Sequence, residues 1–419
     1  MNIPRNYYLN KLIEAKGDNL VKVLTGIRRC GKSYLLDPLF KNYLLSTGVK
    51  ENHIIKLELD KRENEKYRDP DALNEYVKSK IKDEEKYYIL LDEIQLVKDF
   101  ESVLIGFLYN KNLDIYVTGS NSKFLSTDII TEFRGRGEKI EVYPLSFSEF
   151  KTAHEGDNGK ALADYYMYGG LPLVSTMMQT DERKTNYLKE QLNNVYINDV
   201  IERNNLTNGK ETIYTLLEIL SSSIGSLVNA KKISDTFKSN MGINIATETI
   251  TQYLKYLEEA FIIKTAKRYD VKGRKYINTP MKVYFTDIGI RNAVINFRQI
   301  ENPHIMENVI YNELIARNYN VDVGMIESRE YKNGEQEYKQ LEIDFIASKG
   351  YDKYYIQSAY SLPDEEKRNQ ELKPLLKIQD SFKKIIITGD YTNKWKDENG
   401  ITTMNIFDFL NDVGSLEKA

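Results

Sequence analysis

Residues 26–33 form a glycine-rich segment that constrains the fold more than any other part of the sequence. The segment reads Gly-Ile-Arg-Arg-Cys-Gly-Lys-Ser and fits the pattern G-x-x-x-x-G-K-[ST]. It follows the short apolar run Val21–Thr25 and opens a helical pattern, Lys32–Leu45. Glycines at these positions let the chain wrap, so that backbone N–H groups and the helix N-terminus face an anion. The segment therefore predicts a strand, a phosphate-binding loop and a helix in succession.

This phosphate loop (Gly26–Ser33) is the predicted site for ATP and Mg²⁺. We expect the ammonium of Lys32 to reach the β- and γ-phosphates and the hydroxyl of Ser33 to coordinate Mg²⁺. The alternative is an ordinary glycine turn. The residues predicted to bind the nucleotide are Gly26, Ile27, Arg28, Arg29, Cys30, Gly31, Lys32, Ser33 and Tyr34.

A second apolar run ends in two acidic residues. Tyr87–Leu91 is continuously apolar, and Asp92 and Glu93 follow it. A buried strand of this kind places Asp92 beside the magnesium ion and Glu93 beside the water that attacks the γ-phosphate. Alone, the pair is equally typical of a solvated strand end. Downstream of a phosphate loop, Glu93 favours hydrolysis over nucleotide binding alone.

Two further segments are candidates for contact with the γ-phosphate. The apolar run Asp114–Thr118 leads into Gly119-Ser120-Asn121, where a polar side chain would sense the phosphate. We take Asn121 as the catalytic candidate, with Ser120 equally placed and a simple turn as the alternative. Arg134 and Arg136 are candidate arginine fingers, with Arg136 favoured. A finger supplied by a neighbouring chain would require a homo-oligomer, whereas one from the same chain would not.

Composition and charge exclude several classes of protein. The chain has 59 Lys and Arg against 62 Asp and Glu, a net charge of −3, so no global basic field points to nucleic acid or an anionic membrane. No run approaches the roughly 20 apolar residues that cross a bilayer, and the N-terminus lacks a secretory signal, so we expect a cytoplasmic protein without a membrane partner. The single cysteine, Cys30, excludes an intrachain disulfide, and the three histidines lack metal-motif spacing.

The order of the predicted elements indicates an α/β fold with several domains. Short apolar strands alternate with helices up to residue 145, which predicts a parallel sheet covered on both faces. We expect a nucleotide-binding core at 1–150, a helical lid at 151–205, a winged-helix segment at 206–290 and a C-terminal α/β domain at 291–419.

The winged-helix prediction rests on the segment between residues 231 and 282. Ile233–Phe237 and Thr247–Glu259 have helix-turn-helix character, and Phe261–Phe285 is typical of a β-hairpin wing with its tip near Val271–Lys275. The segment contains eleven Lys and Arg but five Asp and Glu, a local charge of +6. Double-stranded DNA is therefore a candidate partner, and a protein partner or simple packing is the alternative. The basic residues at the wing tip are Lys272, Arg274 and Lys275.

As a set, these segments resemble the prokaryotic AAA-type P-loop ATPases that carry a winged-helix middle segment and a C-terminal restriction-endonuclease-like domain of unknown function. The resemblance implies an ATPase with an AAA-like core, and it leaves the cellular task open. It covers nearly the whole chain in the same order, through Thr25–Leu36, Ile89–Gln95, Thr118–Ser122, Gly135-Arg136, Pro144–Phe150, Tyr168–Pro172, Lys282–Gly289, Glu307–Leu314, Glu342–Ala347 and Tyr355–Tyr360.

The tail follows the order of an endonuclease-like metal site but lacks part of its chemistry. Glu313 lies on a predicted helix and Asp344 in a predicted strand, as carboxylates that would hold Mg²⁺. The next strand offers Gln357 and Ala359 where an active site needs an acid and a lysine. We therefore predict a degenerate module that does not cleave DNA, and an active nuclease is the alternative.

The sequence as a whole predicts Mg²⁺-dependent ATP hydrolysis, coupled to binding of DNA or a protein partner through the middle and C-terminal domains. The alternative is a nucleotide-gated regulatory or defence module that turns over little ATP. The two hypotheses differ in whether Glu93 activates water at a useful rate.

Overall fold

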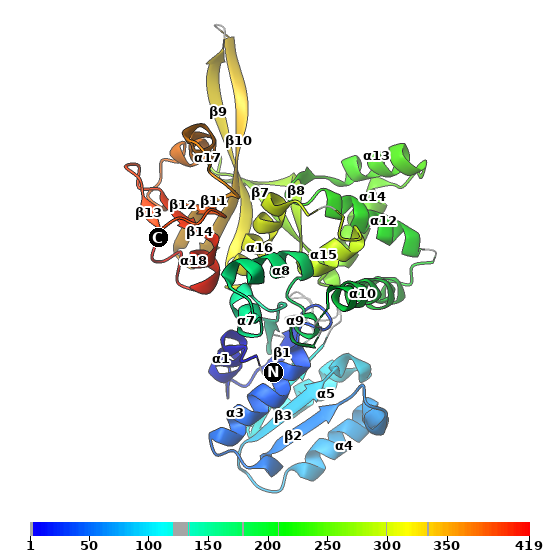
Figure 1. Ribbon diagram of the computed structural model, residues 1–419. Helices are drawn as coiled ribbons and strands as arrows, with labels where there is room; N and C mark the ends of the chain where they lie inside the picture. The colour runs from blue at the N-terminus through cyan, green and yellow to red at the C-terminus, as the bar shows by residue number, and fades with distance from the viewer. Residues whose placement is uncertain are drawn as a thin grey trace. The chain divides into compact units, whose positions relative to one another are not determined.

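The computed structural model describes residues 3–119, 133, 135–177, 180–207, 209–298, 300–332 and 335–419. The chain forms two compact units: an N-terminal unit of residues 1–145 with 259–261, and a C-terminal unit of residues 146–258 with 262–419 (Figure 1). The segments predicted as lid, winged helix and C-terminal domain lie almost entirely in the second unit. Their finer division stays a prediction.

The N-terminal unit is built on a five-stranded sheet in the order β2-β3-β4-β1-β5, and every pair in it is parallel. This confirms the predicted parallel α/β core. The strands are β1 (Val21–Thr25), β2 (Ile54–Glu58), β3 (Tyr87–Asp92), β4 (Leu113–Thr118) and β5 (Gly137–Glu141). The helices and helical turns are α1 (Asn6–Glu14), α2 (Lys32–Tyr34), η1 (Leu35–Phe40), α3 (Lys41–Ser46), η2 (Glu51–His53), η3 (Arg62–Arg68), α4 (Pro70–Lys80), η4 (Ile94–Leu96) and α5 (Phe100–Leu108).

The three central strands of this sheet, β1, β3 and β4, are buried along their whole length. Apolar residues of α4 and α5 pack against them, as expected where helices cover a parallel sheet. The one lysine within β1, Lys22, is also buried and forms an ion pair with Asp114 on β4. The sheet therefore provides a rigid support for the loops at its carboxyl edge.

The predicted helical stretch Lys32–Leu45 forms, but a kink interrupts it. The segment is divided into α2, η1 and α3, and Asp37 inside it has an extended backbone with φ −143° and ψ 119°. Pro38 explains the break, because a proline ring disfavours helical geometry at the residue before it and supplies no N–H donor. The break turns the Asp37 carboxylate towards Lys56 on β2.

The C-terminal unit contains a nine-stranded mixed sheet in the order β13-β14-β12-β11-β10-β9-β7-β8-β6. Its strands are β6 (Leu227–Val228), β7 (Ile263–Asp270), β8 (Lys275–Phe285), β9 (Asn320–Lys332), β10 (Glu335–Lys349), β11 (Asp352–Ala359), β12 (Lys383–Thr388), β13 (Trp395–Lys396) and β14 (Thr402–Asn405). Its helices and helical turns are α7 (Phe147–Thr152), α8 (Asn158–Tyr168), α9 (Pro172–Met177), α10 (Asp181–Gln191), η6 (Leu192–Tyr196), α11 (Ile197–Arg203), α12 (Gly209–Ser222), α13 (Ala230–Met241), α14 (Thr247–Glu259), α15 (Ile288–Val294), α16 (Asn302–Ala316), α17 (Glu365–Leu376) and α18 (Ile406–Asn411). Among the helices that the structure describes, none has both the length and the apolar character needed to cross a bilayer.

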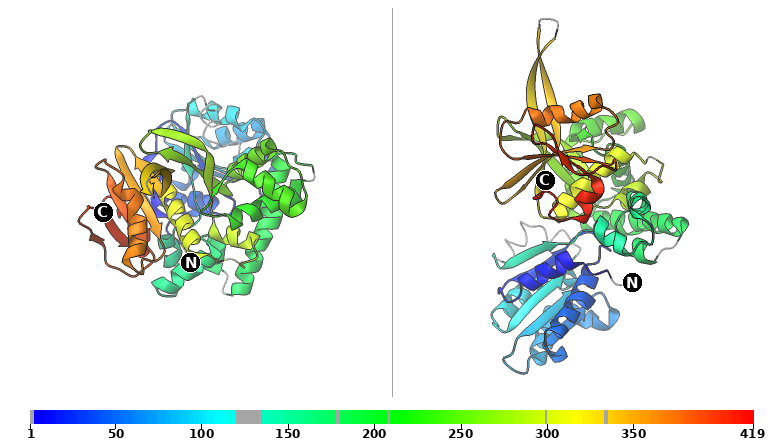
Figure 2. Two further views of the ribbon diagram at one scale, coloured as in Figure 1. Left: turned by 90° about the horizontal axis from the view of Figure 1, so that it is seen from above. Right: turned by 60° about the vertical axis from the view of Figure 1, so that its left-hand side comes forward.

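The predicted hairpin in the middle segment forms, but it is not a free wing. β7 and β8 pair antiparallel on either side of a turn at residues 271–274, close to the predicted tip. On its other edge β7 pairs in parallel with β9, so the hairpin is continuous with the sheet of the tail. Tyr269 and Val271 pack against the apolar core of that sheet. The β9–β10 hairpin, which the sequence analysis missed, extends well beyond the rest of the sheet (Figures 1 and 2).

The chain between the end of α8 at Tyr168 and the start of α9 at Pro172 contacts the loop that precedes α15. Gly169 has φ +71°, and a Cβ there would lie 2.4 Å from Oδ1 of Asp287. The N–H groups of Gly170 and Ile290 donate to the Asp287 carboxylate at 2.8 Å and 3.0 Å, and the second bond caps α15. Burial raises the pKa of Asp287 to about 6. The Asp287 carboxylate therefore connects the segment between α8 and α9 to the start of α15.

Candidate functional site

The phosphate loop leaves the carboxyl end of β1 with geometry that only glycine permits. Gly26 has φ +137°, and a Cβ there would lie 2.1 Å from the carbonyl oxygen of Val142. Gly31 has φ +99° and precedes α2. The thiol of Cys30 donates to the same Val142 oxygen at 3.2 Å. The loop is therefore held against the segment that follows β5, with its curvature fixed by both glycines.

The side chains of the loop divide into an inward and an outward group. Ile27 and Cys30 are buried, so only their backbone is placed to meet a nucleotide. Arg28, Arg29 and Ser33 are exposed, and Tyr34 is half-buried at the start of the helix. Lys32 is 5% exposed, and its ammonium donates to the carbonyl oxygens of Gly26 and Ile27 at 2.9 Å and 3.1 Å. The lysine thus lies folded over the loop, and these two acceptors of its ammonium are neutral carbonyl oxygens.

The structure brings Ser33 and Asp92, the predicted metal ligands, together. Asp92 ends β3 and is 8% exposed, it accepts a hydrogen bond from the hydroxyl of Thr118, and it lines the same cavity as Ser33. Burial raises the pKa of Asp92, and the hydroxyls of Thr118 and Ser33 oppose that rise. A carboxylate and a hydroxyl are oxygen donors of the kind that Mg²⁺ prefers.

A cavity of about 150 Å³ lies beside Ser33 and Asp92. Its other wall carries Asp37, Lys56 and Glu58, and Lys56 forms ion pairs with both acids. Because Mg²⁺ keeps several of its waters in protein sites, a polar cavity next to the two ligands suits a hydrated ion. The residues present therefore fit the predicted magnesium site.

Glu93 is held in an uncommon conformation at the end of β3. Its φ of +56° lies in the left-handed region, which costs free energy for a residue with a Cβ. Its N–H donates to the hydroxyl of Thr118 at 3.0 Å, and its carboxylate accepts a hydrogen bond from the amide of Gln95. The neighbouring strand and loop therefore set the direction of the glutamate.

Two residues that support this site were missed in the sequence analysis. Thr118, the last residue of β4, bonds both Asp92 and Glu93 because β4 lies next to β3 in the sheet. Arg5 is 2% exposed, and its guanidinium donates to the carbonyl oxygens of Cys30 and Tyr143, both at 2.8 Å. Thr118 stood inside a recognised motif, whereas nothing local to Arg5 signals its contact with the loop.

Of the remaining predicted residues of this unit, the structure describes Arg136, which lies at the other end of β1 from the loop. Asn121 and Arg134, together with the alternative Ser120, lie outside the described residues. Arg136 precedes β5, and its carbonyl oxygen accepts the N–H of Val21 at the amino end of β1. The five residues of β1 separate that end from the loop by about 16 Å. Arg136 is exposed and stacks on Tyr109 with 5.6 Å from its Cζ to the ring centre. A finger at this position would act on another chain.

One metal-like grouping lies at the amino edge of the same sheet. His53, Asp83 and Glu85 place three ligand atoms within 4.8 Å of one another. The two ring nitrogens of His53 face different carboxylates, at 3.2 Å and 3.3 Å, and Lys50 already pairs with Glu85. This arrangement is that of a buried histidine between two acids, and it leaves the phosphate loop as the better candidate for a metal ion.

In the C-terminal unit the two carboxylates named from the sequence have different partners. Glu313 is paired with Arg317 at 2.8 Å. Asp344 instead shares the ammonium of Lys282 with Glu307, which lies on the same helix as Glu313. Glu313 follows Glu307 by six positions, which points their side chains about 120° apart around a helix. Ala359 is buried in the core, and Gln357 lies on β11 beside Asp344.

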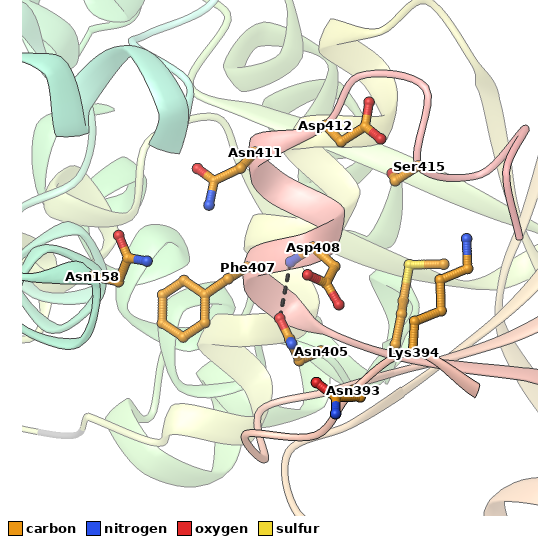
Figure 3. Close-up of a pocket in the computed structure, with 10 residues that line it drawn as sticks. Asn158, Asn393, Lys394, Asn405, Phe407, Asp408, Asn411, Asp412 and Ser415 are labelled. Carbon is orange, nitrogen blue, oxygen red and sulfur yellow. Dashed lines mark hydrogen bonds between the residues drawn. The ribbon is translucent and has the colours of Figure 1, made fainter.

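The C-terminal unit also has a larger surface pocket, of about 590 Å³, around helix α18 (Figure 3). Phe407, Asp408 and Asn411 project from this helix into the pocket, and Asn158 lies across from them. Asn405 caps the helix by accepting the N–H of Asp408 at 2.9 Å. The lining is rich in amides and contains none of the residues predicted from the sequence as functional.

Comparisons with known proteins match most of the N-terminal unit to one family and find relatives over nearly the whole chain. Residues 18–151 match the family described as an AAA domain, and residues 159–301 match a domain of unknown function. An uncharacterized protein of Haemophilus influenzae is 34% identical over 416 residues, which cover 97% of this chain and 98% of the relative. An uncharacterized protein of Methanocaldococcus jannaschii is 29% identical over 405 residues, covering 91% and 85%. The structure of a Walker-type ATPase of Pyrococcus abyssi is similar over 70% of this chain and 96% of its own, with a TM-score of 0.49 and 16% identity.

Proposed function

Because this chain belongs to the family of the Haemophilus influenzae protein and carries an AAA domain, we propose that it binds ATP with Mg²⁺ at the phosphate loop and hydrolyses it. The observation that carries this proposal is that Ser33 of the loop and Asp92 at the acidic end of β3 line the same polar cavity. A loop that only binds nucleotide would not need Glu93 directly after Asp92.

Each residue of the site has a chemical role in this proposal. Lys32 leaves the carbonyl oxygens of Gly26 and Ile27 and binds the β- and γ-phosphates, while the loop N–H groups hold the phosphate oxygens. Ser33 and Asp92 hold Mg²⁺, which neutralises charge on the phosphate oxygens when bound. Glu93 accepts the proton of the attacking water, and Thr118 positions both acids. Arg136 of a neighbouring chain is the proposed finger, in a homo-oligomer.

The C-terminal unit supplies the proposed partner-binding region. The order α12, β6, α13, α14, β7, β8 is that of a winged helix, and it supports double-stranded DNA as a candidate partner. The basic turn residues, Lys272, Arg274 and Lys275, are exposed. However, Arg268 and Lys282 are buried, so the surface between residues 231 and 282 is less basic than its composition indicates. A protein partner is the alternative.

A nucleotide-gated module with slow turnover is the second candidate function. The contact of Gln95 with the carboxylate of Glu93 favours it, because an amide bonded to the glutamate competes with the attacking water. In this alternative, ATP acts as a conformational ligand for a regulatory or defence protein. The two candidates differ in the rate at which Glu93 is released.

Steady-state phosphate release tests the proposal. We expect turnover in the wild type and a loss of at least about 100-fold in Lys32→Ala and Glu93→Gln, because each removes a group that acts in the transition state. Lys98→Ala and Glu65→Gln change exposed residues of the same unit and serve as matched controls. A wild type that binds ATP but turns over no faster than Glu93→Gln would favour the gated module.

Duplex DNA added to the same assay tests the partner. Stimulation of the wild type, lost when Lys272, Arg274 and Lys275 are all changed to Ala, would support DNA binding at the turn. Binding that is unchanged in the triple variant and insensitive to salt would remove this surface from the proposal.

A further inference from the structure

Lys282 lies at the centre of a group of carboxylates in the C-terminal unit. The residue is 1% exposed, and its ammonium lies 2.7 Å from Glu342, 2.8 Å from Glu307 and 3.3 Å from Asp344. The acids come from two elements, α16 and β10, while the lysine comes from β8. β8 and β10 are separated by β7 and β9 in the sheet order, so the lysine is brought to these acids from a distant strand.

The carboxylates are oriented by further hydrogen bonds. Glu307 accepts the hydroxyl of Tyr284 at 2.7 Å on the oxygen that also binds the lysine. Asp344 accepts the N–H of Ser358 at 2.9 Å on its second oxygen, which leaves the first one facing the ammonium. Burial alone would lower the pKa of Lys282, but Glu307, Asp344 and Glu342 together raise it above its usual range. The lysine is therefore a cation at neutral pH.

One further polar group belongs to this cluster and has no partner. Phe345 pairs with Ile356 in the β10–β11 register, so the next pair along the ladder is Asp344 and Gln357, and these two share a face of the sheet. Gln357 is 9% exposed, and its amide oxygen lacks a hydrogen-bond partner among the described residues. A buried carbonyl oxygen without a donor is costly, and oxygens of this kind are ligands for hard cations.

These contacts have the composition of a divalent metal site in which a different cation is present. Three carboxylates around one ammonium, with a buried amide oxygen across from Asp344 on the neighbouring strand, exceed what a single ammonium needs. We propose that the ammonium of Lys282 is the resident cation of a metal-type carboxylate site, so that this site takes no divalent ion in the native chain and becomes one that does when Lys282 is replaced by a neutral side chain. We call this group the carboxylate cluster (Glu307, Glu342, Asp344 and Gln357).

The proposal has a functional consequence for the unit. A lysine on β8 that neutralises acids on α16 and β10 fastens the predicted winged-helix segment to the tail. The carboxylate cluster is then a joint within one body and not a second metal-dependent active site. This consequence is independent of the proposed ATPase activity, because the carboxylate cluster lies wholly in the C-terminal unit.

The test is Mn²⁺ binding by the full chain without nucleotide, followed by electron paramagnetic resonance and by thermal unfolding in Mn²⁺ and in EDTA. We expect Lys282→Met to bind Mn²⁺ and its unfolding temperature to rise by about 5 °C at saturating Mn²⁺. The wild type should show neither change. Lys339→Met, which changes an exposed lysine on β10, is the matched control and should behave as the wild type.

Asp344→Asn in the Lys282→Met background identifies the site, because Mn²⁺ bound at Asp92 would not respond to it. We expect this substitution to abolish the Mn²⁺ signal. A second variant, Lys282→Met with Glu307→Gln, leaves less uncompensated charge and should fold more readily than Lys282→Met. It should still bind Mn²⁺, but more weakly than the single variant. The proposal is overturned if neither Lys282 variant takes up Mn²⁺, or if the wild type binds Mn²⁺ in a way that Asp344→Asn abolishes.

Discussion

Lys32 in the phosphate loop and Lys282 in the carboxylate cluster are both buried lysines, but their ammonium groups have different partners. Lys32 donates to two main-chain carbonyl oxygens, whereas Lys282 lies among three carboxylates. Carbonyl oxygens hold an ammonium without cancelling its charge, so Lys32 keeps a full charge to offer to a phosphate. The carboxylates around Lys282 neutralise it, so that lysine stabilises the fold and has no charge left for a ligand.

The largest expected effect is on stability and sharpens this comparison. We expect Lys282→Met to lower the unfolding free energy of the C-terminal unit by about 3 kcal/mol in EDTA, because it leaves buried carboxylates without their cation. Lys32→Ala should lower that of the N-terminal unit by less than about 1 kcal/mol, since it removes two bonds to neutral acceptors. Urea unfolding followed by circular dichroism measures both.

Trp395 is the only tryptophan of the chain and lies on β13, so its fluorescence reports the C-terminal unit separately. Lys339→Met should unfold as the wild type does in this assay. Equal losses in Lys282→Met and Lys32→Ala would contradict the distinction between a structural and a ligand-binding lysine.

The second expected effect is on catalysis and concerns the two hydrogen bonds that Thr118 makes with Asp92 and Glu93. Thr118→Val keeps the size of the side chain but removes the hydroxyl that bonds Asp92 and Glu93. We expect kcat to fall about tenfold, as the loss of one positioning bond of about 1.4 kcal/mol implies. Thr47→Val removes an exposed hydroxyl and is the control. An unchanged kcat would mean that Asp92 and Glu93 hold their positions without Thr118.

The phosphate loop could be predicted because its parts are local in sequence. Eight consecutive residues carry the loop, and Asp92 and Glu93 directly follow the strand that positions them. The support from Thr118 and Arg5 could not be predicted in the same way. It depends on β4 lying beside β3 and on the packing of the N-terminal segment, which are tertiary facts.

The carboxylate cluster was predicted only in part for the same reason. Asp344 and Gln357 were identified because they lie on neighbouring strands. Lys282 lies far from Asp344 in the sequence, on β8, which is not a neighbour of β10 in the sheet. Glu307 was not singled out, because its contact with Lys282 depends on how α16 packs on the sheet. The break at Asp37 was predictable, since Pro38 lies within the predicted helical stretch.

A third buried ionisable residue, Asp287, extends the comparison to an acid that is held by backbone N–H groups. Burial raises its pKa to about 6, although it accepts N–H groups from Gly170 and Ile290. A raised pKa means that the folded state binds the proton more tightly than the unfolded state. The stability from this residue is therefore present at low pH and is lost as pH rises through about 6.

We expect the C-terminal unit to gain about 1 kcal/mol from Asp287 between pH 7 and pH 5. Urea unfolding of the wild type and of Asp287→Asn at both pH values measures it, and the difference between the two proteins isolates this carboxylate. Asparagine also caps helices, so the variant keeps the cap of α15. A difference that does not change with pH would show that Asp287 stays ionised throughout.

The smallest expected effect concerns Gln95, whose amide donates to the carboxylate of Glu93. If this bond restrains the glutamate, Gln95→Ala should raise kcat about threefold, because a net restraint of about 0.7 kcal/mol on the resting state corresponds to that factor. Phosphate release at saturating ATP measures the change, with Gln370→Ala, an exposed glutamine, as the control. A fall in kcat would instead make Gln95 a positioning residue for Glu93. Glu93 would then resemble Lys282 in that its hydrogen-bond partner holds it in place.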